Sequence, residues 1–103
     1  MEAVIHPDLE LKIHDIQRTA ALLRAINHDL RIRMLNLIHE QGPITVTDIY
    51  TKMGLEQSVA SQHLAILRKA RFVETERQGK CIYYKINYER FTDMEQFMNK
   101  LLS

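Results

Sequence analysis

A group of polar side chains opens the segment 57–70. Gln57, Ser58, Ser61 and Gln62 precede and interleave with apolar residues that recur at helical spacing. On a helix these positions share an outer face near its N-terminus. Amide side chains can discriminate bases, whereas serine hydroxyls mostly bind phosphate oxygens. The pattern is typical of a helix that reads base edges in the major groove of DNA.

Basic side chains and one histidine extend this candidate surface. Arg68 and Lys69 stand at the far end of the same helix, where they either bind phosphate or only stabilise the helix dipole. Arg77 and Lys80 flank a hairpin tip and are stronger candidates for phosphate or minor-groove contacts, with plain solubility as the alternative. His63 has two open roles, a phosphate contact or a cap on a neighbouring segment.

Positive charge is concentrated in the same part of the chain. The formal net charge of all 103 residues is only +1, but residues 57–85 carry six Lys or Arg and two Asp or Glu. The segments on either side are mildly acidic. A basic block between acidic ends predicts a phosphate-facing surface, although a solvated basic face would give the same count.

Apolar periodicity predicts helices first and a hairpin late. Asn27 and Asp29 are candidate helix caps, Gly42 is a candidate helix stop, and Thr45 is expected to cap the third helix. A fourth helix follows the third after a short turn that contains Gly, which is the helix-turn-helix pattern. The expected elements are helices over 8–26, 30–41, 47–53, 57–70 and 91–102, with strands over 72–77 and 81–86 before the last helix.

This order predicts a single winged helix-turn-helix domain over residues 1–103, mainly α with a small β-hairpin (α+β). A chain of this length is too short for two separate cores. Its order of elements is α-α-α-α-β-β-α, with the hairpin as the wing.

Specific residues resemble those of the ArsR/SmtB family of bacterial repressors. The segment 61–68 is similar to the S-x-H-L-x-x-L-R pattern of the family, and 77–80 resembles the wing that follows it. Arg31 and Leu35 resemble the R-x-x-x-L of the second helix. The resemblance covers about residues 25–86. It implies a homodimeric, sequence-specific repressor that binds double-stranded DNA, with a palindromic operator as the expected target.

Both terminal helices carry apolar stripes. A monomer of 103 residues buries only about 60 to 65% of its unfolded surface, which is too little to cover both stripes fully. The resemblance implies that these two helices form the dimer interface. The expected interface residues are Ile13, Ile16 and Ala20 on the first helix and Phe91, Met94, Phe97, Met98 and Leu101 on the last.

The usual metal-ligand positions of the family hold unsuitable residues. They are Thr45, Thr47 and Tyr50 for the arsenic- and lead-type site, and Tyr88, Arg90 and Leu101 for the zinc- and nickel-type site. Hydroxyl groups are poor ligands for soft metals. We therefore expect no metal site and no cofactor, and the sequence does not identify an inducer.

Arg71 departs from the family pattern. Many members have Gly before the first strand of the wing, where the backbone often adopts a left-handed conformation. A non-glycine residue would cost about 1 kcal/mol there. Either the turn differs in this chain or Arg71 contributes elsewhere.

Several other functions are considered against the repressor hypothesis. A winged helix used for protein contact should lack the polar recognition face and the basic wing, and this sequence has both. An enzyme should show a nucleophile with a base, paired acids or a phosphate loop, and the sequence shows none of these, so no enzymatic activity is expected. A DNA-binding protein without a small-molecule inducer, controlled by abundance or a partner protein, is the main alternative.

The sequence also indicates where in the cell the protein is expected to act. The longest apolar runs have four residues, for example at 20–23 and 81–84, against the roughly 20 that cross a bilayer, so no membrane contact is expected. The single cysteine, Cys81, is expected to be a small buried strand residue and cannot form an internal disulfide. These features favour the cytoplasm.

Overall fold

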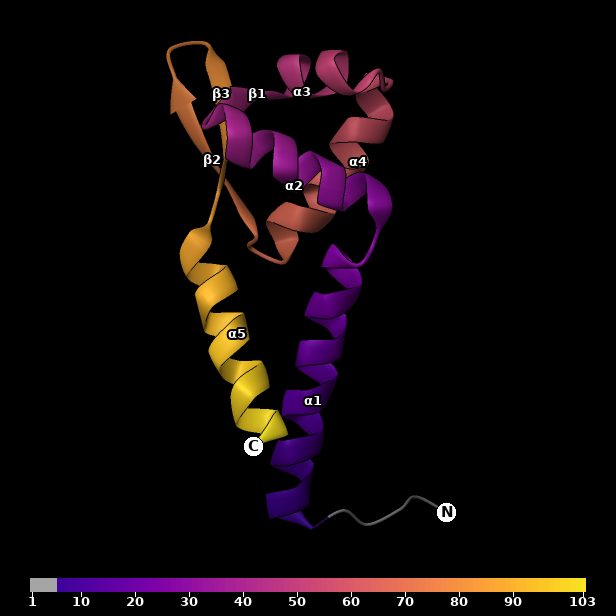
Figure 1. The fold of residues 1–103 in the computed structure, drawn as a ribbon, viewed down its shortest axis with the longest axis vertical. Coiled ribbons are helices and arrows are strands. Elements are labelled where there is room, and N and C mark those ends of the chain that lie inside the picture. Colours follow the sequence, from indigo (N-terminus) through magenta and orange to yellow (C-terminus); the bar gives the residue numbers. More distant parts are fainter. Residues whose placement is uncertain (1–5) are drawn as a thin grey trace.

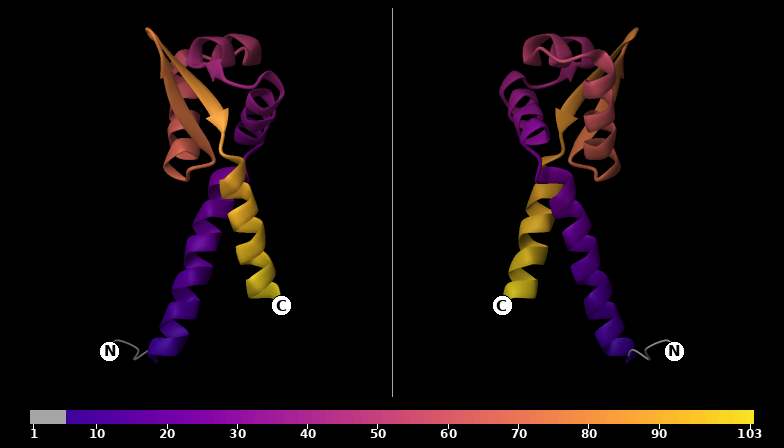
Figure 2. Two further views of the ribbon diagram at one scale, coloured as in Figure 1. Left: turned by 90° about the vertical axis from the view of Figure 1, so that its left-hand side faces the viewer. Right: turned by 90° about the vertical axis from the view of Figure 1, so that its right-hand side faces the viewer.

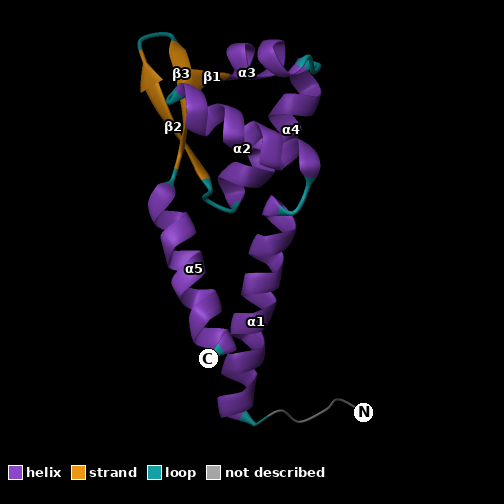
Figure 3. Cartoon of the chain, in the orientation of Figure 1, coloured by secondary structure: helices purple, strands orange, loops and turns teal. Residues whose placement is uncertain are grey.

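The computed structural model of the chain describes residues 6–103. Within this range the polypeptide forms the helices and strands seen in Figures 1 and 3. They are α1 (Pro7–Ile26), α2 (Asp29–Gln41), β1 (Ile44–Thr45), α3 (Val46–Met53), α4 (Gln57–Lys69), β2 (Val73–Gln78), β3 (Cys81–Ile86) and α5 (Tyr88–Leu102).

The molecule is elongated because α1 and α5 extend away from the rest of the fold as two arms (Figures 1 and 2). Its extents are 51 × 30 × 26 Å and its radius of gyration is 16.8 Å. A compact chain of about 100 residues has a radius of gyration near 13 Å. No helix in residues 6–103 is long and apolar enough to cross a membrane.

The helix-turn-helix pair, α3 and α4, is fixed by a cap and a glycine turn. The hydroxyl of Thr45 accepts a hydrogen bond from the Asp48 backbone N–H at 3.2 Å, which confirms the predicted cap. Gly54 ends α3 with a left-handed φ of 67°, and the N–H of Leu55 donates to the carbonyl of Tyr50 at 2.9 Å. These contacts set the turn that leads into α4.

The hydrophobic core lies between α2, α3, α4 and the start of β2. Its largest fully buried side chains are Phe72, Met34, Ile38, Ile49, Leu64, Leu67 and Val73. On α4 the buried side chains are those of Ala60, Leu64 and Leu67, which are spaced by four and three residues. One face of α4 is therefore held against the core, and the opposite face is left exposed.

The wing is a three-stranded antiparallel sheet in the order β1-β3-β2. β2 and β3 pair from Val73 opposite Ile86 to Gln78 opposite Cys81, as a hairpin closed by Gly79 and Lys80. Gly79 has a φ of 62°, the conformation that favours glycine at the first position of a type II′ turn. β1 adds only Ile44 and Thr45, and two residues show no periodicity that a sequence could reveal.

The α1–α2 junction differs from the prediction. Asn27 is the C-cap of α1, but the N-cap of α2 is His28, whose Nδ1 accepts from the Leu30 N–H at 3.1 Å. Asp29 is the first residue of α2 and not its cap. An imidazole nitrogen therefore takes the place that the sequence pattern assigned to a carboxylate.

Arg71 adopts the left-handed conformation, with a φ of 65°. The turn is therefore of the expected type in spite of the departure from glycine. The side chain of Asn87 donates to the Arg71 carbonyl at 3.0 Å, and Arg90 Nε donates to the Ala70 carbonyl at 2.9 Å. The beginning of α5 thus holds the backbone of this strained turn in place.

Candidate nucleic-acid interface

The outer face of α4 presents the four polar side chains predicted to contact DNA. Gln57, Ser58, Ser61 and Gln62 are all exposed. They lie on the first turn and a half of α4, with Ser58 and Gln62 opposite the buried face of that helix and Gln57 and Ser61 nearer its edge. Their amides and hydroxyls are therefore free to meet a ligand that approaches from solvent.

A groove of about 380 Å³ continues this face toward the wing. It is lined by Ser61, Ala65, Arg68 and Lys69 of α4 and by Tyr84 of β3. Spacings of four, seven and eight residues from Ser61 place these helix positions on one side of α4. Arg68 therefore lies on the same face as Ser61, and helical spacing alone could have added Ala65. The contribution of Tyr84 depends on the pairing of the sheet and has no local signal.

The wing tip supplies two exposed basic residues, Arg77 and Lys80. Arg77 Nε donates to the carbonyl of Gly79 at 3.2 Å, which holds this side chain over the turn. The tip, α3 and the start of α4 all lie at the end of the molecule away from the α1 and α5 arms (Figure 1). A long ligand at this end can meet both the α4 face and the wing.

Cys81 is exposed, so the expectation of a buried strand residue was wrong. It is the first residue of β3 and pairs with Gln78, the last residue of β2. At that register the hairpin has extended beyond the core. Strand periodicity places a residue on one side of a sheet but does not say where the core ends.

His63 faces away from this surface and contacts the protein itself. Its Nδ1 lies 3.2 Å from Arg31 Nη1, and its ring centroid lies 4.8 Å from that of His28. Of the two roles left open by the sequence, the structure shows the contact with a neighbouring segment. Burial, followed by the nearby His28 and Arg31, lowers the pKa of His63 below its ordinary value near 6.5.

Comparison with known proteins identifies the family. Residues 28–75 match the family described as bacterial regulatory protein, arsR family. The chain belongs to the ArsR family. It is 29% identical over 94 residues to the transcriptional repressor PagR of Bacillus anthracis, an alignment that covers 91% of this chain and 94% of PagR. The fold and the sequence thus agree on a DNA-binding transcriptional regulator and not an enzyme.

Solved structures of other proteins share the fold of this chain. NolR of Sinorhizobium fredii superimposes with a TM-score of 0.73 at 25% identity, over 97% of this chain and 96% of NolR. A winged helix-turn-helix DNA-binding domain of Mycobacterium bovis, described as homodimeric, gives a TM-score of 0.70 at 24% identity. That match covers 95% of this chain and 87% of the domain.

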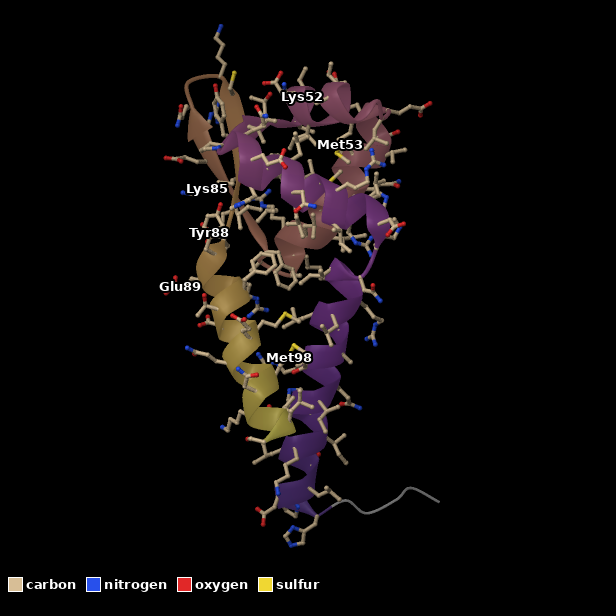
Figure 4. All side chains as sticks on the ribbon, viewed as in Figure 1. Lys52, Met53, Lys85, Tyr88, Glu89 and Met98 are labelled. Atoms are coloured by element: carbon tan, nitrogen blue, oxygen red, sulfur yellow. The ribbon has the colours of Figure 1, made fainter. Side chains whose placement is uncertain are left out.

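The structure divides the predicted dimer residues into two groups. Met94 is only 8% exposed, and the ring of Phe91 packs on Phe72 with 4.9 Å between centroids. Met98 lies between α5 and α1 (Figure 4) and packs against the same core. Phe91, Met94 and Met98 therefore pack against their own chain, and their place in a dimer interface remains a prediction. Their heptad-like spacing cannot distinguish a contact within the chain from one between chains.

Other apolar residues on the arms remain exposed. Ile16 is 55% exposed and Leu101 is 38% exposed, as an interface requires, while Ile13, Ala20 and Phe97 are half-buried. The arms also expose Leu9, Leu11, Leu23 and Leu102. Leu11 lies outside the predicted stripe, and its exposure follows from how α1 extends beyond the core.

Three of the residues at the metal-ligand positions of the ArsR family make other side-chain contacts in this chain. Thr45 caps α3, the hydroxyl of Tyr88 lies 2.7 Å from His39 Nδ1, and Arg90 Nε donates to Ala70. Figure 4 shows Tyr88 at the beginning of α5. In the part of the chain from His6 onward, no three His, Cys, Asp or Glu side chains are grouped to hold a metal ion. Independence from metals remains a prediction.

Proposed function

We propose that this ArsR-family protein is a homodimeric repressor that binds a palindromic operator. The N-terminal part of α4 would enter the major groove, and the wing would contact the backbone or the minor groove. The observation that carries the proposal is the exposed face of Gln57, Ser58, Ser61 and Gln62, at the same end of the fold as the basic wing. Polar side chains near the start of a recognition helix read base edges in such complexes.

Dimerisation is supported by the arms. They expose Ile16, Leu101 and other apolar side chains that water would cover in a monomer. A two-fold axis would pair the arms of two chains and present two copies of α4 to one side of a duplex. The half-sites would then lie about one helical turn apart. The homodimeric description of the Mycobacterium bovis domain supports the same arrangement.

The repressor would act in the cytoplasm, where its DNA target lies, without using the metal sites of the family. Thr45, Tyr88 and Arg90 are engaged in caps and hydrogen bonds that a bound metal would have to break. An inducer of another chemical class, or control by abundance or a partner protein, would then release the operator.

Selection from a random pool of duplexes tests the proposal. The purified chain should enrich an inverted repeat whose half-sites are about 10 base pairs apart, centre to centre. A parallel selection with Gln57→Ala and Gln62→Ala combined should lose that motif, because both base-reading amides are removed. Absence of any salt-dependent DNA binding would overturn the proposal and favour a winged helix that contacts protein.

A further inference from the structure

The guanidinium of Arg31 joins three helices. Arg31 belongs to α2, and its Nε donates to the carbonyl of Ala25 at 2.7 Å while Nη2 donates to that of Arg24 at 3.2 Å. Both carbonyls are in the last turn of α1. The remaining contact, from Nη1 to His63 Nδ1 at 3.2 Å, reaches α4. A single side chain thus ties the α1 arm to the recognition helix.

This arrangement requires a neutral His63. A guanidinium only donates hydrogen bonds and stays charged, so the Nδ1 of His63 must be the acceptor. The adjacent His28 is constrained in the same way, because its Nδ1 accepts from the N–H of Leu30 at 3.1 Å. In both imidazoles Nδ1 is therefore the acceptor, and the proton of the neutral His63 ring is on Nε2.

Protonation of His63 would break this connection. The new Nδ1–H would face the Arg31 donor, and the added charge would lie beside Arg31 of α2 and 4.8 Å, ring to ring, from His28 at the α1–α2 junction. In residues 6–103 no carboxylate forms an ion pair with these groups. The same surroundings lower the pKa of His63, so the neutral form is favoured at neutral pH.

We propose that Arg31 and His63 are a positioning pair that fixes α1 relative to α4 only while His63 is neutral, so that acidification weakens operator binding. This inference rests on the proposed function, since α1 is taken as a dimer helix and α4 as the recognition helix. A change in the angle between them alters the separation of the two α4 copies in the dimer. Half-site spacing is a geometric requirement of two-fold recognition, so such a change lowers specific affinity.

The predicted change in DNA affinity on acidification is opposite in sign to the change that simple electrostatics would give. The chain has five histidines, and their protonation adds positive charge to each protomer. Added positive charge strengthens binding to the phosphate backbone. A loss of affinity on acidification would therefore indicate a change in the position of α1 relative to α4 and not an effect of net charge.

Fluorescence anisotropy with the selected duplex, from pH 8.0 to 5.5 at constant ionic strength, measures this effect. Wild-type affinity should be constant above about pH 7 and should fall as the pH is lowered below 6.5 toward 5.5, because His63 becomes protonated there and two His63 side chains act in one dimer. His63→Asn places an amide oxygen near the Nδ1 position and cannot titrate. It should lose less affinity at pH 7.5 than His63→Ala does, and its pH profile should be flat.

A matched control replaces His39 by Asn. His39 is an exposed histidine of α2 whose partner is Tyr88, outside the Arg31 contacts, so this variant should keep the wild-type pH profile. Light scattering should show a dimer at both ends of the pH range. An affinity that rises steadily as the pH falls, or a His63→Asn profile like that of the wild type, would overturn the inference.

The ¹⁵N chemical shifts of the imidazoles test the pair independently of DNA. His63 Nδ1 should be unprotonated at pH 7.5 and should protonate below the ordinary pKa near 6.5. A protonated Nδ1 at pH 7.5 would overturn the inference even if DNA binding is normal. Failure of the wild type to bind any duplex at pH 7.5 would instead count against the proposed function, and the ¹⁵N shifts would still test the contact.

Discussion

On α4, neighbouring side chains have opposite roles because the helix turns by about 100° per residue. Gln62 points to solvent, whereas the next residue, His63, contacts Arg31 beneath the helix. The sequence motif contains both residues and does not separate them. The buried positions Ala60, Leu64 and Leu67 define the inner face, and the side chains predicted to contact DNA are among the exposed residues that remain.

Replacing Gln62 by Ala should reduce specificity more than general affinity. An amide that hydrogen-bonds a base edge contributes about 1 to 3 kcal/mol to discrimination, and random DNA offers no matched partner. Anisotropy with the selected and a scrambled duplex gives the specificity ratio, which should shrink. Equal losses on both duplexes would show that Gln62 contacts the backbone.

Replacing Arg77 and Lys80 by Ala should have the contrary effect. Both are exposed at the wing tip, and phosphate contacts do not depend on sequence. Binding to both duplexes should weaken by similar factors. The slope of log K against log salt should become shallower by about 1 for each lost contact, doubled in a symmetric dimer. If only the sequence preference changes, the wing reads bases.

At the scale of elements, segments with a periodicity of their own were predicted to within one residue at each end, except the beginning of α5, and β1 was not predicted. The strand 81–86 was predicted with its observed bounds, and α1 and α4 differ by one residue at one end. β1 escaped prediction because Ile44 and Thr45 form a strand only by pairing with β3. The recognition face follows from helical periodicity, but the groove wall at Tyr84 and the inward turn of His63 are tertiary contacts.

The turn between α4 and β2 offers a test of strain. Arg71 is held at a φ of 65°, where a side chain with a Cβ costs about 1 kcal/mol and glycine costs little. Arg71→Gly should therefore raise the free energy of unfolding by up to about 1 kcal/mol, part of the gain being offset by the greater freedom of glycine in the unfolded chain. Urea denaturation followed by circular dichroism measures the change.

Arg71→Ala is the control, since it removes the guanidinium but keeps the Cβ. It should give no gain in stability, because the left-handed backbone is still strained. If Arg71→Ala stabilised the fold as much as Arg71→Gly, the gain would come from removing the positive charge of Arg71 and not from relieving backbone strain. Arg71 does act electrostatically on Arg90, because burial and then the charge of Arg71 lower the pKa of Arg90.

At the scale of the whole molecule, the two arms limit how much of its apolar surface a single chain can bury. The packing of Phe91 on Phe72 and the burial of Met94 attach α5 to the winged core, but beyond that attachment α1 and α5 extend away from the core and diverge from each other (Figure 2). Apolar periodicity located these stripes. It could not divide them into intramolecular and exposed parts, because the division depends on how far each helix reaches beyond the core.

The exposed part of the arms predicts where a dimer can be disrupted. Ile16→Glu combined with Leu101→Glu should convert the dimer to a monomer, because charged side chains would have to be buried at the interface. The fold of each chain should survive, since both positions are exposed within one protomer. Ile32→Glu, at a 40% exposed isoleucine on α2, provides the matched control and should remain dimeric. Sedimentation equilibrium at micromolar concentration distinguishes the 12.1 kDa chain from twice that mass. A dimeric mass for the double variant would mean that the partner chain packs elsewhere, and a monomeric wild type would remove the basis for palindromic recognition.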